Sequence, residues 1–96
     1  MSRTRLAGMS PTARAWYLAE IAYLSERNPV AAAKVSEKMR IARQTLAEYP
    51  NIGPSGRSPG TRRLVVGSYI LTVRRHRGET EIIHIRHGRQ TEKSKD

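Results

Sequence analysis

Eight arginines lie between positions 57 and 89 of the 96-residue chain, and they most clearly suggest a chemical role. The same stretch contains only two acidic residues, Glu79 and Glu81. A guanidinium group presents a planar pair of N–H donors that binds phosphate or carboxylate oxygens in a bidentate manner. The sequence therefore predicts a surface that binds an anionic target, and its candidate residues are Arg57, Arg62, Arg63, Arg74, Arg86 and Arg89.

His87 adds an imidazole, which titrates near neutral pH, to this arginine-rich stretch. A histidine can act as a general base in phosphodiester cleavage, and neighbouring guanidinium groups can stabilise the charge that develops on phosphorus. A ribonuclease site of this kind would use His87, Arg62, Arg86 and Arg89. The alternative is an ordinary histidine at the end of a strand, and the sequence leaves both interpretations open.

The sequence contains no recognisable metal or cofactor site. The chain has no cysteine, which removes thiolate ligands and thiolate nucleophiles. His84 and His87 are three residues apart on a predicted strand, so their side chains should project to opposite faces of the sheet. Phosphate-binding signatures such as Walker A and G-x-G-x-x-G are not present in the sequence. We expect neither a metal nor a cofactor.

The net charge predicts an anionic partner. Eighteen Lys and Arg against eight Asp and Glu give a formal charge of +10 at pH 7, and such a charge repels itself unless an anion lies nearby. Nucleic acid, an acidic protein and an anionic membrane surface all satisfy this condition. The sequence has neither a secretion signal nor a run of apolar residues long enough to span a bilayer. We therefore expect a cytoplasmic protein without a membrane role.

The length of the chain accommodates one small domain, which we assign to residues 1–96. Ser10-Pro11 is a strong helix start and Asn28-Pro29 both ends one helix and starts the next. The second helix has the clearest apolar periodicity, with spacings of three and four residues. The predicted segments are a possible edge strand at 3–9, helices at 11–27 and 29–49, a Gly/Pro-rich loop at 50–61, a three-stranded meander at 62–87 and a polar tail at 88–96.

These segments predict an α+β fold, in which the N-terminal helix hairpin packs on one face of a small antiparallel sheet. The other sheet face should remain open. Strict alternation along the last strand places Ile83 and Ile85 on the helix-covered face, and Ile82, His84 and Arg86 on the open face.

Several sequence blocks resemble the RelE/ParE toxin superfamily. They are Asn-Pro-Val-Ala-Ala-Ala at 28–33, the segment 46–53, the Gly-Arg-Ser-Pro-Gly-Thr-Arg-Arg-Leu-Val-Val block at 56–66, the strand at 69–74 and the segment 81–89 that ends in His87-Gly88-Arg89. The resemblance implies a toxin of a bacterial type II toxin–antitoxin system, to whose sheet the N-terminal residues add a strand. It also implies a cognate antitoxin, usually acidic, that binds the toxin in a hetero-oligomer.

The superfamily has two functional classes. RelE-like members cut mRNA on the ribosome, whereas ParE-like (plasmid stabilisation) members inhibit DNA gyrase. The 59–66 block and the strand-end His87-Gly88 resemble the ParE-like class more closely, and the sequence has no tyrosine after Tyr69 for a RelE-like site. The resemblance therefore favours a growth-inhibiting gyrase inhibitor that is not an enzyme. The alternatives are a metal-independent, ribosome-dependent mRNA endonuclease and a basic nucleic-acid-binding protein.

Overall fold

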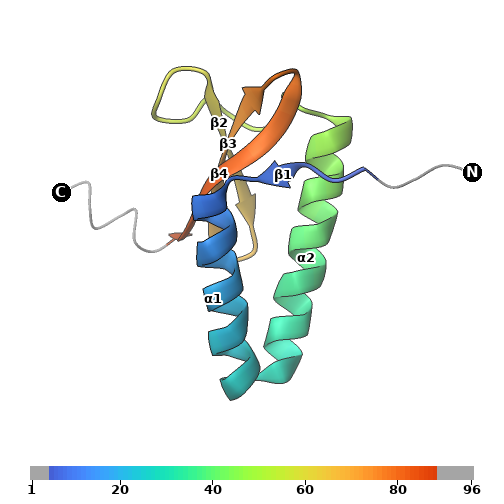
Figure 1. Cartoon of the computed structure of the whole chain (residues 1–96), viewed down its shortest axis with the longest axis vertical. Coiled ribbons are helices and arrows are strands. Elements are labelled where there is room, and N and C mark those ends of the chain that lie inside the picture. The colour runs from blue at the N-terminus through green and yellow to red at the C-terminus, as the bar shows by residue number, and fades with distance from the viewer. Residues whose placement is uncertain (1–4, 89–96) are drawn as a thin grey trace, which may run out of the picture.

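Two helices and four strands make up the fold in the computed structural model, which describes residues 5–88 (Figure 1). The elements are β1 (Gly8–Met9), α1 (Pro11–Arg27), α2 (Pro29–Glu48), β2 (Thr61–Val66), β3 (Tyr69–His76) and β4 (Glu79–His87). The start of the strand predicted at 3–9 and nearly all of the tail predicted at 88–96 lie outside the described residues, as does Arg89.

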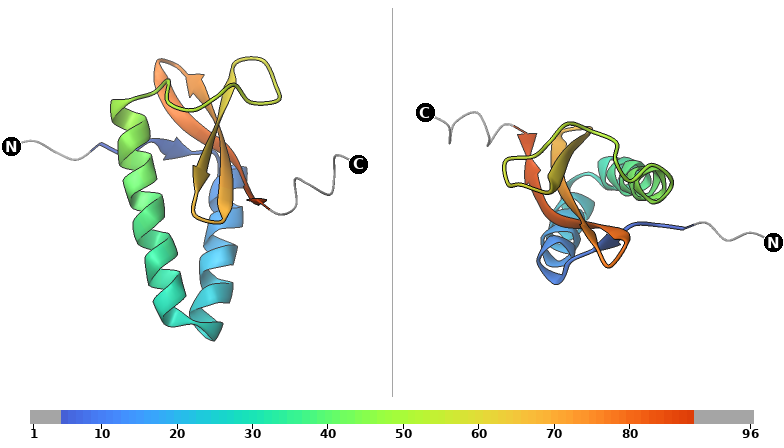
Figure 2. Two further views of the ribbon diagram at one scale, coloured as in Figure 1. Left: turned by 180° about the vertical axis from the view of Figure 1, so that it is seen from behind. Right: turned by 90° about the horizontal axis from the view of Figure 1, so that it is seen from above.

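The two helices begin and end at residues that satisfy their free backbone groups. The Ser10 hydroxyl accepts a hydrogen bond from the Ala13 backbone N–H, and Pro11 occupies the first helical position. Asn28 serves both helices, because its backbone N–H donates to the Leu24 carbonyl and its side chain accepts from the Ala31 N–H. One residue thus joins α1 to α2, and the closed end of the hairpin projects past the sheet (Figure 1, Figure 2).

The sheet has the strand order β1-β4-β3-β2. The pairs β2–β3 and β3–β4 are antiparallel, whereas the short β1 pairs in parallel with β4. One sheet face packs against the helix hairpin, and the loop between α2 and β2 lies at the end of the sheet remote from the closed end of the hairpin (Figure 2). The predicted α+β class and the N-terminal edge strand are confirmed. The strand is shorter than predicted, since it covers Gly8–Met9 and not residues 5–7, and its parallel pairing makes the sheet mixed instead of wholly antiparallel.

The core lies between the hairpin and the central strands. α2 contributes Met39 and Leu46, and β3 contributes Leu71; all three are almost fully buried. Neither helix in the described part of the chain is long and apolar enough to cross a membrane.

A β-bulge determines which residues of β4 face the core. Thr72 of β3 pairs with His84, but the next residue, Val73, pairs with Ile82, so Ile83 has no partner of its own. Ile82 and Ile85 are therefore both buried in the core, with exposed fractions of 0% and 2%. The prediction that Ile83 packs on the helices and Ile82 faces outwards was wrong, because alternation does not account for the extra residue.

Candidate anion-binding groove

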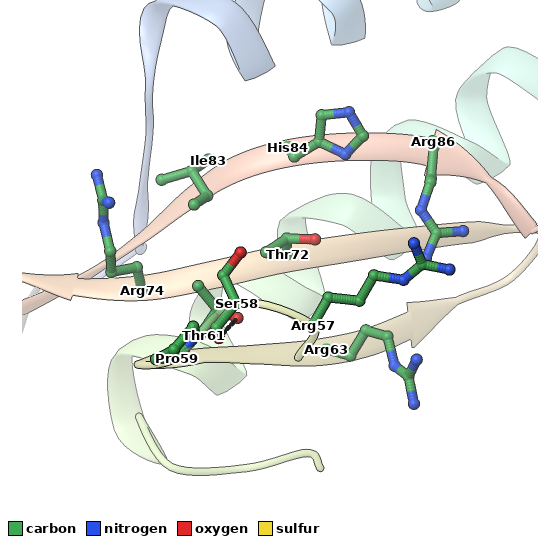
Figure 3. A pocket seen from close by; sticks show the side chains of 10 residues that line it. All are labelled: Arg57, Ser58, Pro59, Thr61, Arg63, Thr72, Arg74, Ile83, His84 and Arg86. Carbon is green, nitrogen blue, oxygen red and sulfur yellow. Dashed lines mark hydrogen bonds between the residues drawn. The ribbon is translucent and has the colours of Figure 1, made fainter. Parts of the chain in front are cut away.

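A groove with a volume of about 580 Å³ lies on the sheet face opposite the helices, beside the loop that precedes β2 (Figure 3). The groove arginines, as we call them, are Arg57, Arg63, Arg74 and Arg86. The other side chains that line it belong to Ser58, Pro59, Thr61, Thr72, Ile83 and His84. Four of the six residues predicted to bind an anionic target thus come together in one place.

Three neighbouring strands bring these side chains to one face. Arg63 on β2 lies opposite Thr72 on β3, and Thr72 lies opposite His84 on β4. Arg74 lies two residues from Thr72 along β3, and Arg86 lies two residues from His84 along β4, in the opposite direction along the sheet. Both side chains therefore project from the same sheet face as Thr72 and His84. In Figure 3 the Arg57 side chain extends from the loop along the sheet towards the guanidinium group of Arg86.

The loop that carries Arg57 is held against β2 by hydrogen bonds at both of its ends. The Thr61 hydroxyl donates to the Ser58 carbonyl over 2.6 Å, and the Gly56 N–H donates to the Thr61 carbonyl over 2.8 Å. Earlier in the loop, the Pro54 carbonyl accepts from the N–H of Arg63 over 2.9 Å. Arg57 therefore lies on a docked loop, which reduces the conformational entropy lost when a ligand binds.

The groove arginines have no internal counter-charge. None of them forms an ion pair or a side-chain hydrogen bond with another described residue. Nη1 of Arg86 is buried and has no hydrogen-bond partner among residues 5–88. Four like charges in one groove repel one another, and an unpaired buried donor is unfavourable. An anionic ligand would relieve both penalties.

Arg62, also predicted to bind the target, lies away from the groove. It pairs with the buried Val73, so its side chain belongs to the opposite sheet face from that of Arg63. Its Nη1 donates to the carbonyl oxygen of Gly53 over 2.8 Å. Arg62 therefore anchors the loop. Arg89 lies outside the described residues, and the structure does not place it.

His87 also lies on the helix side of the sheet. Its ring packs against Trp16 and Tyr69, with centroid distances of 5.3 and 5.2 Å. Its Nε2 is 3.6 Å from a carboxylate oxygen of Glu20. The structure therefore separates His87 and Arg62 from Arg86 and does not assemble the predicted ribonuclease set as one site.

Sequence reasoning did not identify the cluster around His87. The Tyr69 hydroxyl donates to the Glu20 carboxylate over 2.7 Å, and burial, followed by this carboxylate, raises the pKa of Tyr69. Glu20 and Tyr69 are 49 residues apart, and no local pattern links them. Sequence reasoning also did not assign His84 to a site, although alternation places it on the open face. Within residues 5–88, no three His, Asp or Glu side chains gather in a way that could hold a metal ion.

Comparison with known proteins identifies the family. Residues 9–92 match the family model described as "ParE toxin of type II toxin-antitoxin system, parDE". The chain is also 39% identical over 71 residues to the protein named "Putative toxin Y4kP" of Sinorhizobium fredii (strain NBRC 101917 / NGR234), and the alignment covers 72% of this chain and 73% of that protein. The chain therefore belongs to the ParE toxin family of type II toxin–antitoxin systems.

Proposed function

We propose that this ParE-family toxin inhibits DNA gyrase and that a cognate acidic antitoxin neutralises it in a hetero-oligomeric complex. The family match over residues 9–92 carries this proposal. The formal charge of +10 supports an acidic antitoxin, because complementary charge speeds association and favours the correct partner. Both partners would meet the toxin in the bacterial cytoplasm.

The arrangement of the groove supports inhibition by binding. The groove arginines offer donors for anionic groups, and His87 packs among Trp16 and Tyr69 on the other side of the sheet. Its nearest charged partner there is Glu20, not an arginine of the groove. A toxin of this design would act by occupying its target.

A ribosome-dependent mRNA endonuclease is the second candidate, because one imidazole does line the groove. His84 is exposed and lies on the same face as Arg63 and Arg86. An imidazole beside guanidinium groups can transfer a proton while they stabilise a phosphorane. His84 would then replace His87 as the candidate base.

Induced expression in a bacterial host distinguishes the two candidates. The full chain is induced with and without its antitoxin, and plasmid supercoiling and mRNA integrity by primer extension are measured on the same cultures. Purified toxin is then added to gyrase in a supercoiling assay. We expect supercoiling to fall, mRNA to stay intact and the antitoxin to restore growth. Intact supercoiling together with cleaved mRNA would instead establish the endonuclease.

A further inference from the structure

The groove on the open sheet face has a charge pattern that selects among anionic ligands. Its arginines have no ion-pair partner in the described part of the chain. Glu81 lies opposite Arg74 in the strand register, but it neither lines the groove nor forms an ion pair with Arg74. The groove thus has several free cationic positions rather than one.

From this arrangement we infer that the groove binds the sugar–phosphate backbone of duplex DNA. Across the sheet, Arg63 of β2 and Arg86 of β4 are two strand spacings apart, or about 10 Å, and Arg86 also lies two residues further along its strand. Over about 10 Å of the helix axis, one strand of B-DNA presents about three phosphates, because each nucleotide adds a rise of about 3.4 Å along that axis. Hydroxyl groups of Ser58 and Thr72 also line the groove, and hydroxyls are common partners of phosphate oxygens.

A duplex fits the lining better than a single strand does. Proteins that bind single strands stack the unpaired bases on aromatic side chains. None of the residues that line the groove is Trp, Tyr or Phe. Trp16 and Tyr69 pack against each other on the helix side, with ring centroids 5.9 Å apart. The groove therefore offers contacts to phosphates, which a duplex presents on its outside, and no platform for bases.

The position of the groove also favours a nucleic acid over an acidic peptide. Extended peptides usually bind by hydrogen bonds to main-chain groups at a free sheet edge. The groove instead lies over the faces of β2, β3 and β4. The outer edge of β2 beside it is already bonded by the preceding loop, through Gly56 to Thr61 and Pro54 to Arg63. A phosphate backbone needs only the side-chain donors that this face provides.

The role of this contact rests on the proposed function, because gyrase acts on duplex DNA. A toxin that holds the DNA segment carried by gyrase would oppose its passage. Duplex binding itself is measured on the toxin alone, so the two proposals are tested separately.

The test compares two double variants that each remove two positive charges from the full chain. Arg57→Gln/Arg86→Gln changes the groove, whereas Lys34→Gln/Lys38→Gln changes exposed lysines on α2. Fluorescence anisotropy measures binding of each protein to a labelled duplex of arbitrary sequence over a series of salt concentrations. Circular dichroism confirms that both variants remain folded.

We expect the groove variant to bind the duplex at least about tenfold more weakly than the lysine variant at low salt, because it loses two contacts to phosphates. Each lost contact also lowers the slope of log affinity against log salt by about one. The groove variant's plot of log affinity against log salt should be shallower by about 2 than that of the wild type. Equal losses in the two variants, or a wild type that does not bind at low salt, would overturn the inference.

Two further ligands test the choice of a duplex. Binding of a single strand of equal length more tightly than the duplex would overturn the inference, as would displacement of the duplex by polyglutamate at equal charge concentration. A toxin that binds DNA through the groove but leaves gyrase active would refute only the proposed function. A toxin that inhibits gyrase without binding DNA would refute only this inference.

Discussion

Nη1 of Arg62 donates a hydrogen bond to the carbonyl oxygen of Gly53 over 2.8 Å, and this contact joins the loop before β2 to the strand that follows it. The residue next to it, Arg63, lines the groove on the opposite sheet face. Two adjacent arginines therefore have different positions, because one holds the loop that carries Arg57 and the other lines the groove.

The backbone of this loop predicts a large effect of substitution at Gly53. Gly53 has φ of 95°, and a Cβ there would collide with the carbonyl oxygen of Arg63. We expect Gly53→Ala to lower the free energy of unfolding by more than about 2 kcal/mol, since strain and steric overlap add. Urea denaturation measures the change.

Gly60 provides the matched control for the loop. Its φ of 82° imposes a similar backbone strain, but no atom lies within 4 Å of an added Cβ. Gly60→Ala should therefore lower the free energy of unfolding by only about 1 kcal/mol. Equal effects of the two substitutions would show that an added Cβ at Gly53 does not collide with the Arg63 carbonyl oxygen.

The bulge in β4 predicts different roles for two adjacent isoleucines. Ile82 is fully buried in the core, and Ile83 lines the groove. We expect Ile82→Val to lower the free energy of unfolding by about 1 kcal/mol and Ile83→Val to lower it by less than about 0.5 kcal/mol. Thermal or urea unfolding distinguishes them, and the reverse order would indicate that β4 follows strict alternation.

Local signals in the sequence were sufficient to predict the helices and the fold class. Ser10-Pro11 and Asn28-Pro29 determine the helix boundaries through contacts within four residues, and such contacts can be recognised without knowledge of the rest of the chain. The bulge at Ile83 could not be predicted in this way, because it depends on how β4 aligns with β3. The same shift of register moved Ile82 into the core.

The candidate site was predictable by residue type but only partly by position. Alternation separates adjacent residues such as Arg62 and Arg63, or Arg86 and His87, onto opposite faces. The face that remains open is determined by helix packing, a long-range property of the fold. For the same reason the contact between Glu20 and Tyr69 left no trace in the local sequence pattern.

The hydrogen bond from Tyr69 to Glu20 predicts a loss of stability when the hydroxyl is removed. Tyr69 is 8% exposed, and the Glu20 side chain is 14% exposed. Tyr69→Phe leaves this largely buried carboxylate without its donor, which should cost about 1–2 kcal/mol. Tyr23→Phe is the control, because Tyr23 is 54% exposed and its hydroxyl has no partner in the described part of the chain. Urea denaturation should show a change of less than about 0.5 kcal/mol for the control.

The raised pKa of Tyr69 predicts a pH dependence of stability. Burial and the Glu20 carboxylate favour the protonated hydroxyl in the folded protein, so its pKa lies above the unfolded value of about 10. The resulting stabilisation is fully present below about pH 10 and is lost as pH rises towards the folded pKa. The free energy of unfolding of the wild type should therefore fall more steeply than that of Tyr69→Phe between about pH 9 and pH 11. Parallel curves would contradict the shift.

The two histidines of β4 provide the sharpest test of how the toxin acts. His84 lines the groove, whereas His87 packs on Trp16 and Tyr69. If the toxin inhibits gyrase by binding, no imidazole is needed for proton transfer, so His84→Ala and His87→Ala should both retain growth arrest at matched protein levels. His87→Ala should still unfold more readily, because its aromatic contacts are lost.

An endonuclease predicts a different outcome, in which His84→Ala abolishes mRNA cleavage while His87→Ala preserves it, since only His84 shares a face with the groove arginines. Primer extension on the induced cultures measures this difference directly.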